Sequence, residues 1–167
     1  ETEPELGGRF TRALYFPEEA HLDPRQALGA LTQTLREQNV EIITSEGHFT
    51  QHAIDCRGLT AQDQLSDLRG VKGEMLVLRC PELTFNRPIR LLHPRIPIYL
   101  VPRGEGVYML GATMLESNDR RRATVRSVLE LLSSAYALHP AFGEAEIIEI
   151  GVDAVSYTHL TLPTIVS

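Results

Sequence analysis

The sequence predicts an α+β fold, in which a mixed and largely antiparallel sheet packs against helices. Two observations support this prediction. From Gly70 onward the texture is β, with four candidate strands separated by turns, then one long helix and a last strand. Before Gly70 the chain instead carries short strand-like pieces on either side of a helix, as in a βαβ arrangement. The two textures together favour α+β over an all-β class.

The part before Gly70 predicts one amphipathic helix. Asp23 is suited to cap its start and Pro24 to occupy its first position, because proline needs no hydrogen-bond acceptor there. The helix is expected to run to about Gln38, on apolar residues at helical spacing: Ala27, Leu28, Leu31 and Leu35. The short strands expected around it are residues 14–16, 40–43 and 52–56.

The part after Gly70 predicts strands at residues 72–79, 89–92, 96–101 and 107–113, a helix over about 121–138 and a last strand over 144–152. The third and fourth strands are expected to form a hairpin. If Gly104-Glu105 is a two-residue type II′ turn, Tyr99 pairs with Leu110, and Tyr99 and Met114 share one face of the sheet. A bend or bulge after Ala112 is then needed to bring Tyr99 and Met114 close enough to contact one ligand. With a three-residue turn, the two residues would no longer share one face.

Composition excludes several function classes. The chain of 167 residues has a net charge of −6, which disfavours nucleic-acid binding. Its longest apolar runs are under ten residues, too short to span a bilayer. The acidic opening is unlike a secretory signal, and the two cysteines, Cys56 and Cys80, suit a reducing compartment. We therefore expect a cytoplasmic protein, or a true start further upstream.

Three motifs carry a family resemblance. Val71-Lys72-Gly73-Glu74-Met75, Tyr99-Leu100-Val101-Pro102-Arg103 and Gly111-Ala112-Thr113-Met114 resemble the D-amino-acid oxidase family of FAD-dependent enzymes, and most of all the glycine oxidases of thiamine biosynthesis. The resemblance extends from about Phe10 to Asp153. It implies oxidation of a small, glycine-like amino acid to its imine by hydride transfer to FAD, with dioxygen or another electron acceptor taking the electrons.

The resemblance also assigns roles to individual residues. It implies that Tyr99 lies over the flavin and contacts the substrate, and that Met114 lines the same pocket. A phenol can hydrogen-bond a substrate carboxylate without adding charge, and a thioether leaves room only for a small side chain. The alternative is that both are ordinary residues of the sheet core.

A second motif, Cys56-Arg57-Gly58, corresponds to a small-residue turn that the family places against the adenosine side of FAD. A glycine there lets the backbone approach the cofactor closely. The match is partial, because Ala or Ser is commoner at the positions of Cys56 and Arg57. His52 and Cys56 alone make no metal site, and a structural role for Cys56 is favoured.

The resemblance divides the chain into residues 1–23, a substrate-domain strand, residues 24–70, a remnant of the FAD-binding domain, and residues 71–154, the substrate-binding domain. Residues 155–167 contain no charged side chain and are expected to be a non-native tail; a genuine Thr-rich tail is the alternative. The glycine-rich turn that binds the FAD pyrophosphate and the arginine that grips the substrate carboxylate are absent from this sequence. We therefore expect an enzyme fragment, marginally soluble, that neither holds FAD tightly nor turns over.

Two other functions stay open. The same fold serves dehydrogenases that pass electrons to a partner protein, and a non-catalytic binding or assembly module would also fit a chain without those two elements. Whether the protein forms a homo-oligomer is not determined by the sequence.

Overall fold

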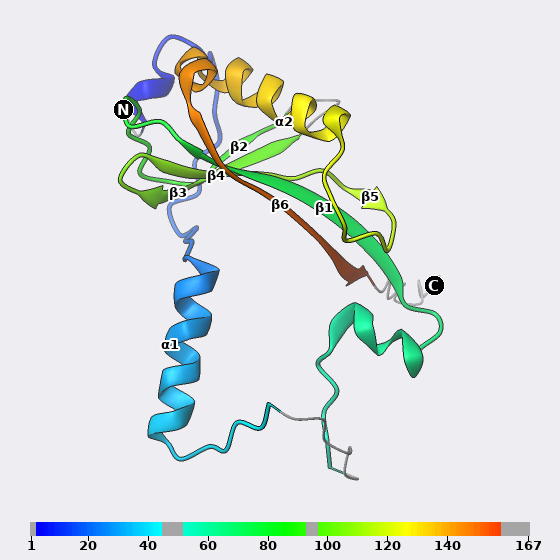
Figure 1. Ribbon diagram of the computed structural model, residues 1–167. Coiled ribbons are helices and arrows are strands. Elements are labelled where there is room, and N and C mark those ends of the chain that lie inside the picture. Colours follow the sequence, from blue (N-terminus) through cyan, green and yellow to red (C-terminus); the bar gives the residue numbers. More distant parts are fainter. Residues whose placement is uncertain (1–2, 45–51, 93–96, 158–167) are drawn as a thin grey trace, which may run out of the picture. The chain divides into compact units, whose positions relative to one another are not determined.

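The computed structural model describes residues 3–44, 52–92 and 97–157. They form two compact units: one comprises Glu1–Ala13 with Cys56–Ser167, and the other Leu14–Asp55. The larger unit contains a six-stranded sheet in the order β2-β3-β4-β1-β5, with β6 paired to β1 (Figure 1). The predicted α+β class is confirmed.

The strands of the larger unit are all paired antiparallel within the described residues. Their bounds are Arg69–Arg79 (β1), Ile89–Leu91 (β2), Ile98–Gly104 (β3), Val107–Gly111 (β4), Leu115–Glu116 (β5) and Glu146–Tyr157 (β6). The helix α2 spans Val125–Leu138, and short 3₁₀ helices lie at Pro4–Leu6, Gly58–Asp63 and Pro140–Glu144. The predicted strands and helix after Gly70 are therefore present, although Ile96 lies outside the described residues and β5 was not predicted.

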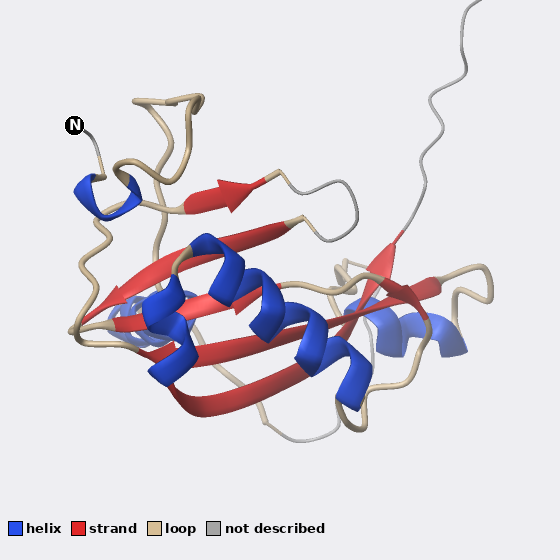
Figure 2. Cartoon of the chain, turned by 90° about the horizontal axis from the view of Figure 1, so that it is seen from above, coloured by secondary structure: helices blue, strands red, loops and turns tan. Residues whose placement is uncertain are grey.

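The core lies between the sheet and α2, which crosses one sheet face (Figure 2). Its centre is apolar and fully buried: Leu76, Leu78, Leu100, Leu110, Leu131 and Leu138. Burying one such side chain contributes about 1.5–3 kcal/mol. Phe85, Tyr108 and Phe142 pack as neighbouring rings at one end of this core, with centroids 5.7–6.3 Å apart. The helix is thus held mainly by apolar packing.

Both ends of α2 are satisfied locally. Thr124 caps the start, because its hydroxyl accepts a hydrogen bond from the Ser127 N–H, so the helix begins later than the predicted 121. At the other end, Arg9 donates to the carbonyl oxygens of Ala137 and Leu138. This contact ties the amino-terminal segment to the unit that contains the sheet.

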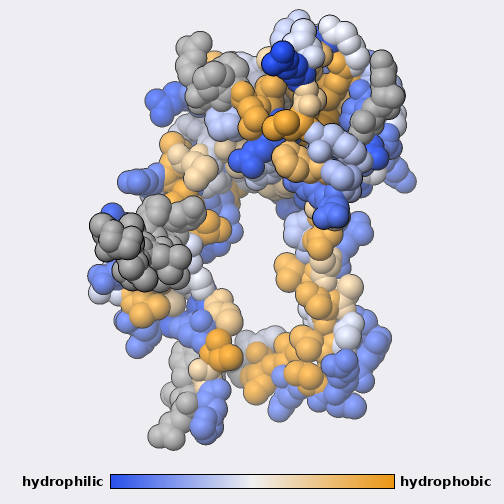
Figure 3. All heavy atoms as spheres, turned by 180° about the vertical axis from the view of Figure 1, so that it is seen from behind, coloured by the Kyte–Doolittle hydropathy of each residue, from blue (hydrophilic) through white to orange (hydrophobic). Residues whose placement is uncertain are grey.

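The smaller unit contains α1, Pro24–Glu37. The predicted cap is confirmed, since the Asp23 carboxylate accepts from the N–H groups of Arg25 and Gln26. The apolar stripe of α1 is exposed, and exposed apolar side chains are visible along this unit (Figure 3). The strands predicted at residues 14–16, 40–43 and 52–56 are wrong, because these residues form no strand. A strand needs a neighbouring backbone to pair with, and the described residues give these segments none.

The β6 strand is longer than predicted. Val155, Ser156 and Tyr157 continue its ladder opposite Val71, Gly70 and Arg69. The first three residues of the predicted tail are therefore part of the sheet, and residues 158–167 lie outside the described residues.

The predicted register of the β3–β4 hairpin is wrong by one residue. The turn is formed by Glu105 and Gly106, both with positive φ (51° and 72°), and Gly104 pairs with Val107 across it. Two positive φ angles are the mark of a type I′ turn, not of the predicted type II′. A register shift between Pro102 and Gly104 then places Tyr99 opposite Gly111 and not opposite Leu110.

Replacing the two turn glycines with alanine is expected to have unequal effects. Gly104 also has a positive φ (88°), but a Cβ atom there meets nothing within 4 Å, so Gly104→Ala should cost only about 1 kcal/mol of backbone strain. At Gly106 a Cβ atom would lie 2.6 Å from the Cα of Pro81, which cannot move aside cheaply. Gly106→Ala should therefore be clearly the less stable variant by urea unfolding, and equal losses would contradict this account of the turn.

Candidate active-site face of the sheet

The candidate site lies on the sheet face that α2 does not cover. Along β1 the burial alternates, with Lys72, Glu74, Leu76 and Leu78 buried toward α2 and the residues between them partly exposed on the other face. On that open face the strand pairing aligns Tyr99 of β3, Gly111 of β4, Met75 of β1 and Gly151 of β6 in one transverse row. We call these four residues the open-face row.

The glycines of the open-face row make room for its two large side chains. A Cβ atom on Gly111 would lie 2.7 Å from both Cζ and Oη of Tyr99, so the phenol ring lies across β4 at that glycine. A Cβ atom on Gly151 would lie 2.9 Å from Cγ and Cε of Met75, which covers β6 in the same way. Tyr99 keeps 39% of its surface exposed. The row is therefore a low, half-exposed apolar surface with one phenol hydroxyl at its centre.

Met114 is not a member of the open-face row. It precedes β5, whose Leu115 pairs with Lys72, three residues along β1 from Met75. At about 3.4 Å per residue this is a displacement of about 10 Å. Met114 is 74% exposed, which is unlike a residue of the sheet core. Met75 was not predicted as a site residue. The register places it opposite Gly111, which pairs with Tyr99, and only the observed register reveals this alignment.

The Cys56-Arg57-Gly58 segment lies outside that row. Cys56 is exposed, and Arg57 stands directly before the 3₁₀ helix Gly58–Asp63. The guanidinium of Arg57 forms a two-pronged ion pair with Asp63, at 2.9 and 3.1 Å, and this hydrogen bonding holds the pKa of Asp63 below its ordinary value. Gly58 has a positive φ of 60°. The role of this segment beside the cofactor stays a prediction.

Two buried charges lie on the other face of β1. Glu74 is fully buried and Lys72 nearly so, with Nζ of Lys72 3.6 Å from Oε1 of Glu74. Lys72 also donates to the Arg122 carbonyl oxygen at 2.7 Å and lies 3.8 Å from Asp119. Buried charges are stable only when paired and hydrogen-bonded, which this arrangement provides.

The Glu74 carboxylate is surrounded by donors. Oε2 accepts from the Thr113 hydroxyl at 2.8 Å and Oε1 from the Thr124 N–H at 3.2 Å, and the nearby Ser127 hydroxyl, which is hydrogen-bonded to Thr124, also acts to lower the pKa of the carboxyl. Burial acts to raise the pKa of Glu74, but these hydrogen bonds and the charge of Lys72 outweigh it and hold the pKa below its ordinary value. Glu74 is therefore ionised at neutral pH and acts only as an acceptor.

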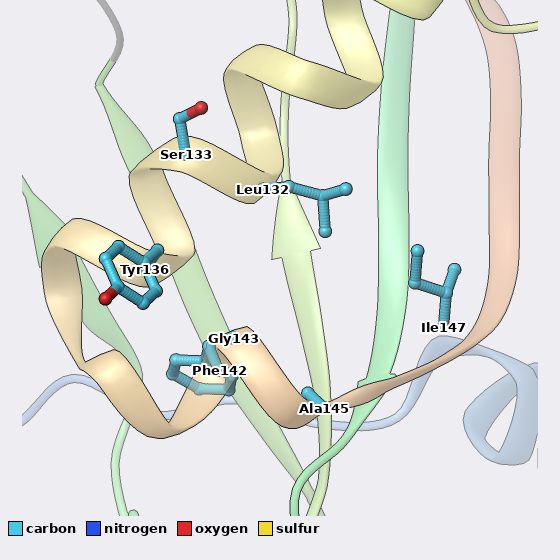
Figure 4. Close-up of a pocket in the computed structure, with 7 residues that line it drawn as sticks. All are labelled: Leu132, Ser133, Tyr136, Phe142, Gly143, Ala145 and Ile147. Atoms are coloured by element: carbon cyan, nitrogen blue, oxygen red, sulfur yellow. The ribbon is translucent and has the colours of Figure 1, made fainter.

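A groove lies on the side of the sheet that α2 covers. Its volume is about 400 Å³, and it is lined by Leu132, Ser133, Tyr136, Phe142, Gly143, Ala145 and Ile147 (Figure 4). It is mainly apolar and lies over the helix-covered face, away from the open-face row. Within residues 3–44, 52–92 and 97–157, no group of three or more His, Cys, Asp or Glu side chains could hold a metal ion. Nor does any helix in this part of the chain have the length and apolar character needed to cross a membrane.

The chain belongs to the DAO family of FAD-dependent oxidoreductases, whose profile matches residues 1–160. It is 50% identical over 153 residues to the putative thiamine biosynthesis oxidoreductase ThiO of Rhizobium etli, a match that covers 89% of this chain and 47% of that protein. It is 26% identical over 164 residues to the bifunctional protein ThiO/ThiG of Synechocystis, covering 85% of this chain and 25% of the relative. The chain thus spans about half the length of the first relative and a quarter of the second.

Among solved structures, the fold is similar to that of glycine oxidase from Geobacillus kaustophilus. The TM-score is 0.52 at 24% identity, over 65% of this chain and 30% of that one. This likeness supports the fold, and the family membership confirms the resemblance drawn from the three motifs, including the dependence of the family on FAD.

The buried carboxylate predicts a pH dependence of stability. Because the pKa of folded Glu74 lies below the ordinary value of 4.5, its ionised form contributes stability that is fully present above pH 4.5 and is lost as the pH falls through the folded-state pKa. Glu74→Gln leaves the buried Lys72 with only the partly exposed Asp119 as counter-charge and should cost about 3 kcal/mol at pH 7. The difference from wild type should shrink as the pH falls below 4.5.

Urea unfolding across this pH range measures the effect. The exposed Glu144→Gln variant is the control for the loss of one negative charge and should follow the wild-type profile. A constant difference between wild type and Glu74→Gln at every pH would show that the carboxylate is not the titrating group.

Proposed function

We propose that this chain is part of an FAD-dependent oxidase that converts a small, glycine-like amino acid to its imine. The observation that carries the proposal is the open-face row, in which the phenol of Tyr99 lies across Gly111 and is aligned with Met75 through that glycine. These three residues come from the three motifs that carry the family resemblance, and adjacent strands bring them together. The identity with the Rhizobium etli relative, named for thiamine biosynthesis, supports the same class of reaction.

The residues present fit one side of a flavin. A flat ring system needs a low apolar surface, and the open-face row is low because two of its four residues are glycines, over which the Tyr99 and Met75 side chains lie. When bound, FAD would supply the acceptor for a hydride from the substrate carbon. The Tyr99 hydroxyl is free to donate a hydrogen bond to the substrate carboxylate, Met114 would line the pocket beyond it, and Cys56, Arg57 and Gly58 would face the adenosine end.

On this proposal three segments of the chain, whose bounds differ from those of the two compact units, have separate roles. Residues 71–154 are the substrate-binding domain, to which the segment 1–23 contributes, and residues 24–70 belong to the FAD-binding domain. The contacts of Arg9 with the end of α2 support the first assignment as far as residue 13. The exposed apolar stripe of α1 supports the second, because an amphipathic helix is stable when that stripe is covered by the rest of its domain.

The test uses the complete reading frame, loaded with FAD. Glycine should reduce the flavin without oxygen and consume oxygen when it is present. Tyr99→Phe should raise KM for glycine about tenfold, the value of one hydrogen bond to a charged group, with less effect on the rate of flavin reduction at saturation. Tyr136→Phe makes the same chemical change on the α2 face and should leave KM unchanged.

Three outcomes separate the alternatives. Flavin reduction without oxygen consumption would make the protein a dehydrogenase that passes electrons to a partner. No reduction by glycine or other small amino acids would favour a non-catalytic module. Equal effects of Tyr99→Phe and Tyr136→Phe would remove Tyr99 from the site.

A further inference from the structure

One residue on the covered face of β1 is bonded to the segment that carries Met114. Glu74 and Thr113 are joined by three hydrogen bonds: the Thr113 N–H donates to the Glu74 carbonyl oxygen at 3.2 Å, the Glu74 N–H donates to Thr113 Oγ1 at 3.0 Å, and that hydroxyl donates to Glu74 Oε2 at 2.8 Å. Met114 follows Thr113 directly.

These bonds begin where the regular ladder ends. The pairing of β4 with β1 stops at Gly111 and Met75, and β5 resumes at Leu115 and Lys72. Regular alternation from Gly111 would turn Thr113 toward the open face, yet its hydroxyl lies against Glu74 on the face toward α2. The side-chain alternation therefore shifts by one residue between Gly111 and Thr113, at the place where a bend was expected from the sequence.

The opposite side of the same carboxylate holds the start of α2. Oε1 accepts from the Thr124 N–H, the Ser127 hydroxyl is hydrogen-bonded to the Thr124 side chain, and Lys72 supplies the counter-charge. A carboxylate can accept on both oxygens at once and never presents a competing donor, which a glutamine amide would. Glu74 therefore links three elements, β1, the β4–β5 connection and α2, through a single buried group.

We propose that Glu74 is a positioning residue that fixes where Met114 lies, acting through Thr113 from the face of the sheet opposite the pocket. The inference rests on the proposed function for the meaning of that position, since it assigns Met114 to the wall of the substrate pocket. It extends that function by making the selectivity for a small substrate depend on a residue that touches neither substrate nor cofactor.

The two sides of the carboxylate give a matched pair of variants. Thr113→Val and Ser127→Ala each remove one hydroxyl close to Glu74: the first is bonded to the carboxylate on the side of Met114, and the second is bonded to Thr124 on the side of α2. Both should lower the unfolding midpoint, because each removes a side-chain hydrogen bond. Only Thr113→Val should change the position of Met114, and Thr113→Ser, which keeps the hydroxyl, should restore it.

The chain itself allows this to be measured without any activity. It has three methionines, so ε-¹³C-methyl labelling gives three signals, which the Leu variants of Met75, Met109 and Met114 assign. Thr113→Val should move or broaden the Met114 signal more than the other two, whereas Ser127→Ala should leave it in place. An unmoved Met114 signal in Thr113→Val, or an equal change in Ser127→Ala, would overturn the proposal.

A second measurement, in the complete FAD-loaded enzyme, tests the consequence for selectivity. Thr113→Val should lower the ratio of kcat/KM for glycine to that for D-alanine by about tenfold, the scale of one methyl group in a pocket, while Ser127→Ala and Thr113→Ser retain the ratio. Met114→Leu separates the hypothesis that Met114 lines the pocket from the hypothesis that Glu74 positions Met114. If it leaves the ratio unchanged, the pocket role of Met114 fails, and the methyl signals alone decide whether Glu74 positions it.

Discussion

The alternation of side chains along β1 is the constraint on which the rest of the larger unit depends. This strand pairs with β4 and β5 along one edge and with β6 along the other, so its two faces set the two faces of the sheet. Leu76 and Leu78 fix which face α2 covers, and Met75 is thereby directed to the other face. A slip of one residue would exchange the core and the open face and would bury Met75 in place of Glu74.

The covered face combines two kinds of interaction at its two ends. At the end near Leu78, aromatic rings and leucines pack against α2, and the Tyr108 hydroxyl donates to the Leu83 carbonyl oxygen. At the end near Lys72, a buried ion pair meets the start of the helix. A buried ion pair contributes little net stability, because desolvation offsets its attraction, but it tolerates only one arrangement of donors. The apolar end thus supplies the stability, and the charged end specifies how α2 and the β4–β5 connection meet β1.

The sequence was informative where a local rule decides the structure and less so where partners decide it. Asp23 and Pro24 mark the start of α1 correctly, because an N-cap is satisfied within its own turn. The strand at residues 40–43 was predicted from apolar residues alone and is absent, because its formation depends on pairing with another strand. The hairpin register failed for a second reason: Gly104, Glu105 and Gly106 allow two tight turns one residue apart, and local chemistry does not choose between them.

The same limits apply to the candidate site. Tyr99 was predicted as a site residue from its motif. Its neighbours in the open-face row were not predicted, since that row exists only in the observed register. Lys72 and Glu74 are two residues apart in a predicted strand, so they lie on the same face as Leu76 and Leu78. Two charged residues on an otherwise apolar face are the signal that would have revealed the buried ion pair and its hydrogen bonds.

The two faces of β1 are connected through one dipeptide. Thr113 is bonded to Glu74 beneath the sheet, and Met114, joined to it by a peptide bond, is exposed beyond the row that contains Tyr99. Thr113 is held at both its N–H and its hydroxyl, and Leu115, on the other side of Met114, pairs with Lys72, so the backbone is held on both sides of Met114. The position of an exposed, flexible side chain can therefore be set by a buried carboxylate on the far side of a strand. This arrangement also explains why the Glu74 side chain needs two oxygens: one faces the connection that it positions, and the other faces the helix that keeps the carboxylate itself in place.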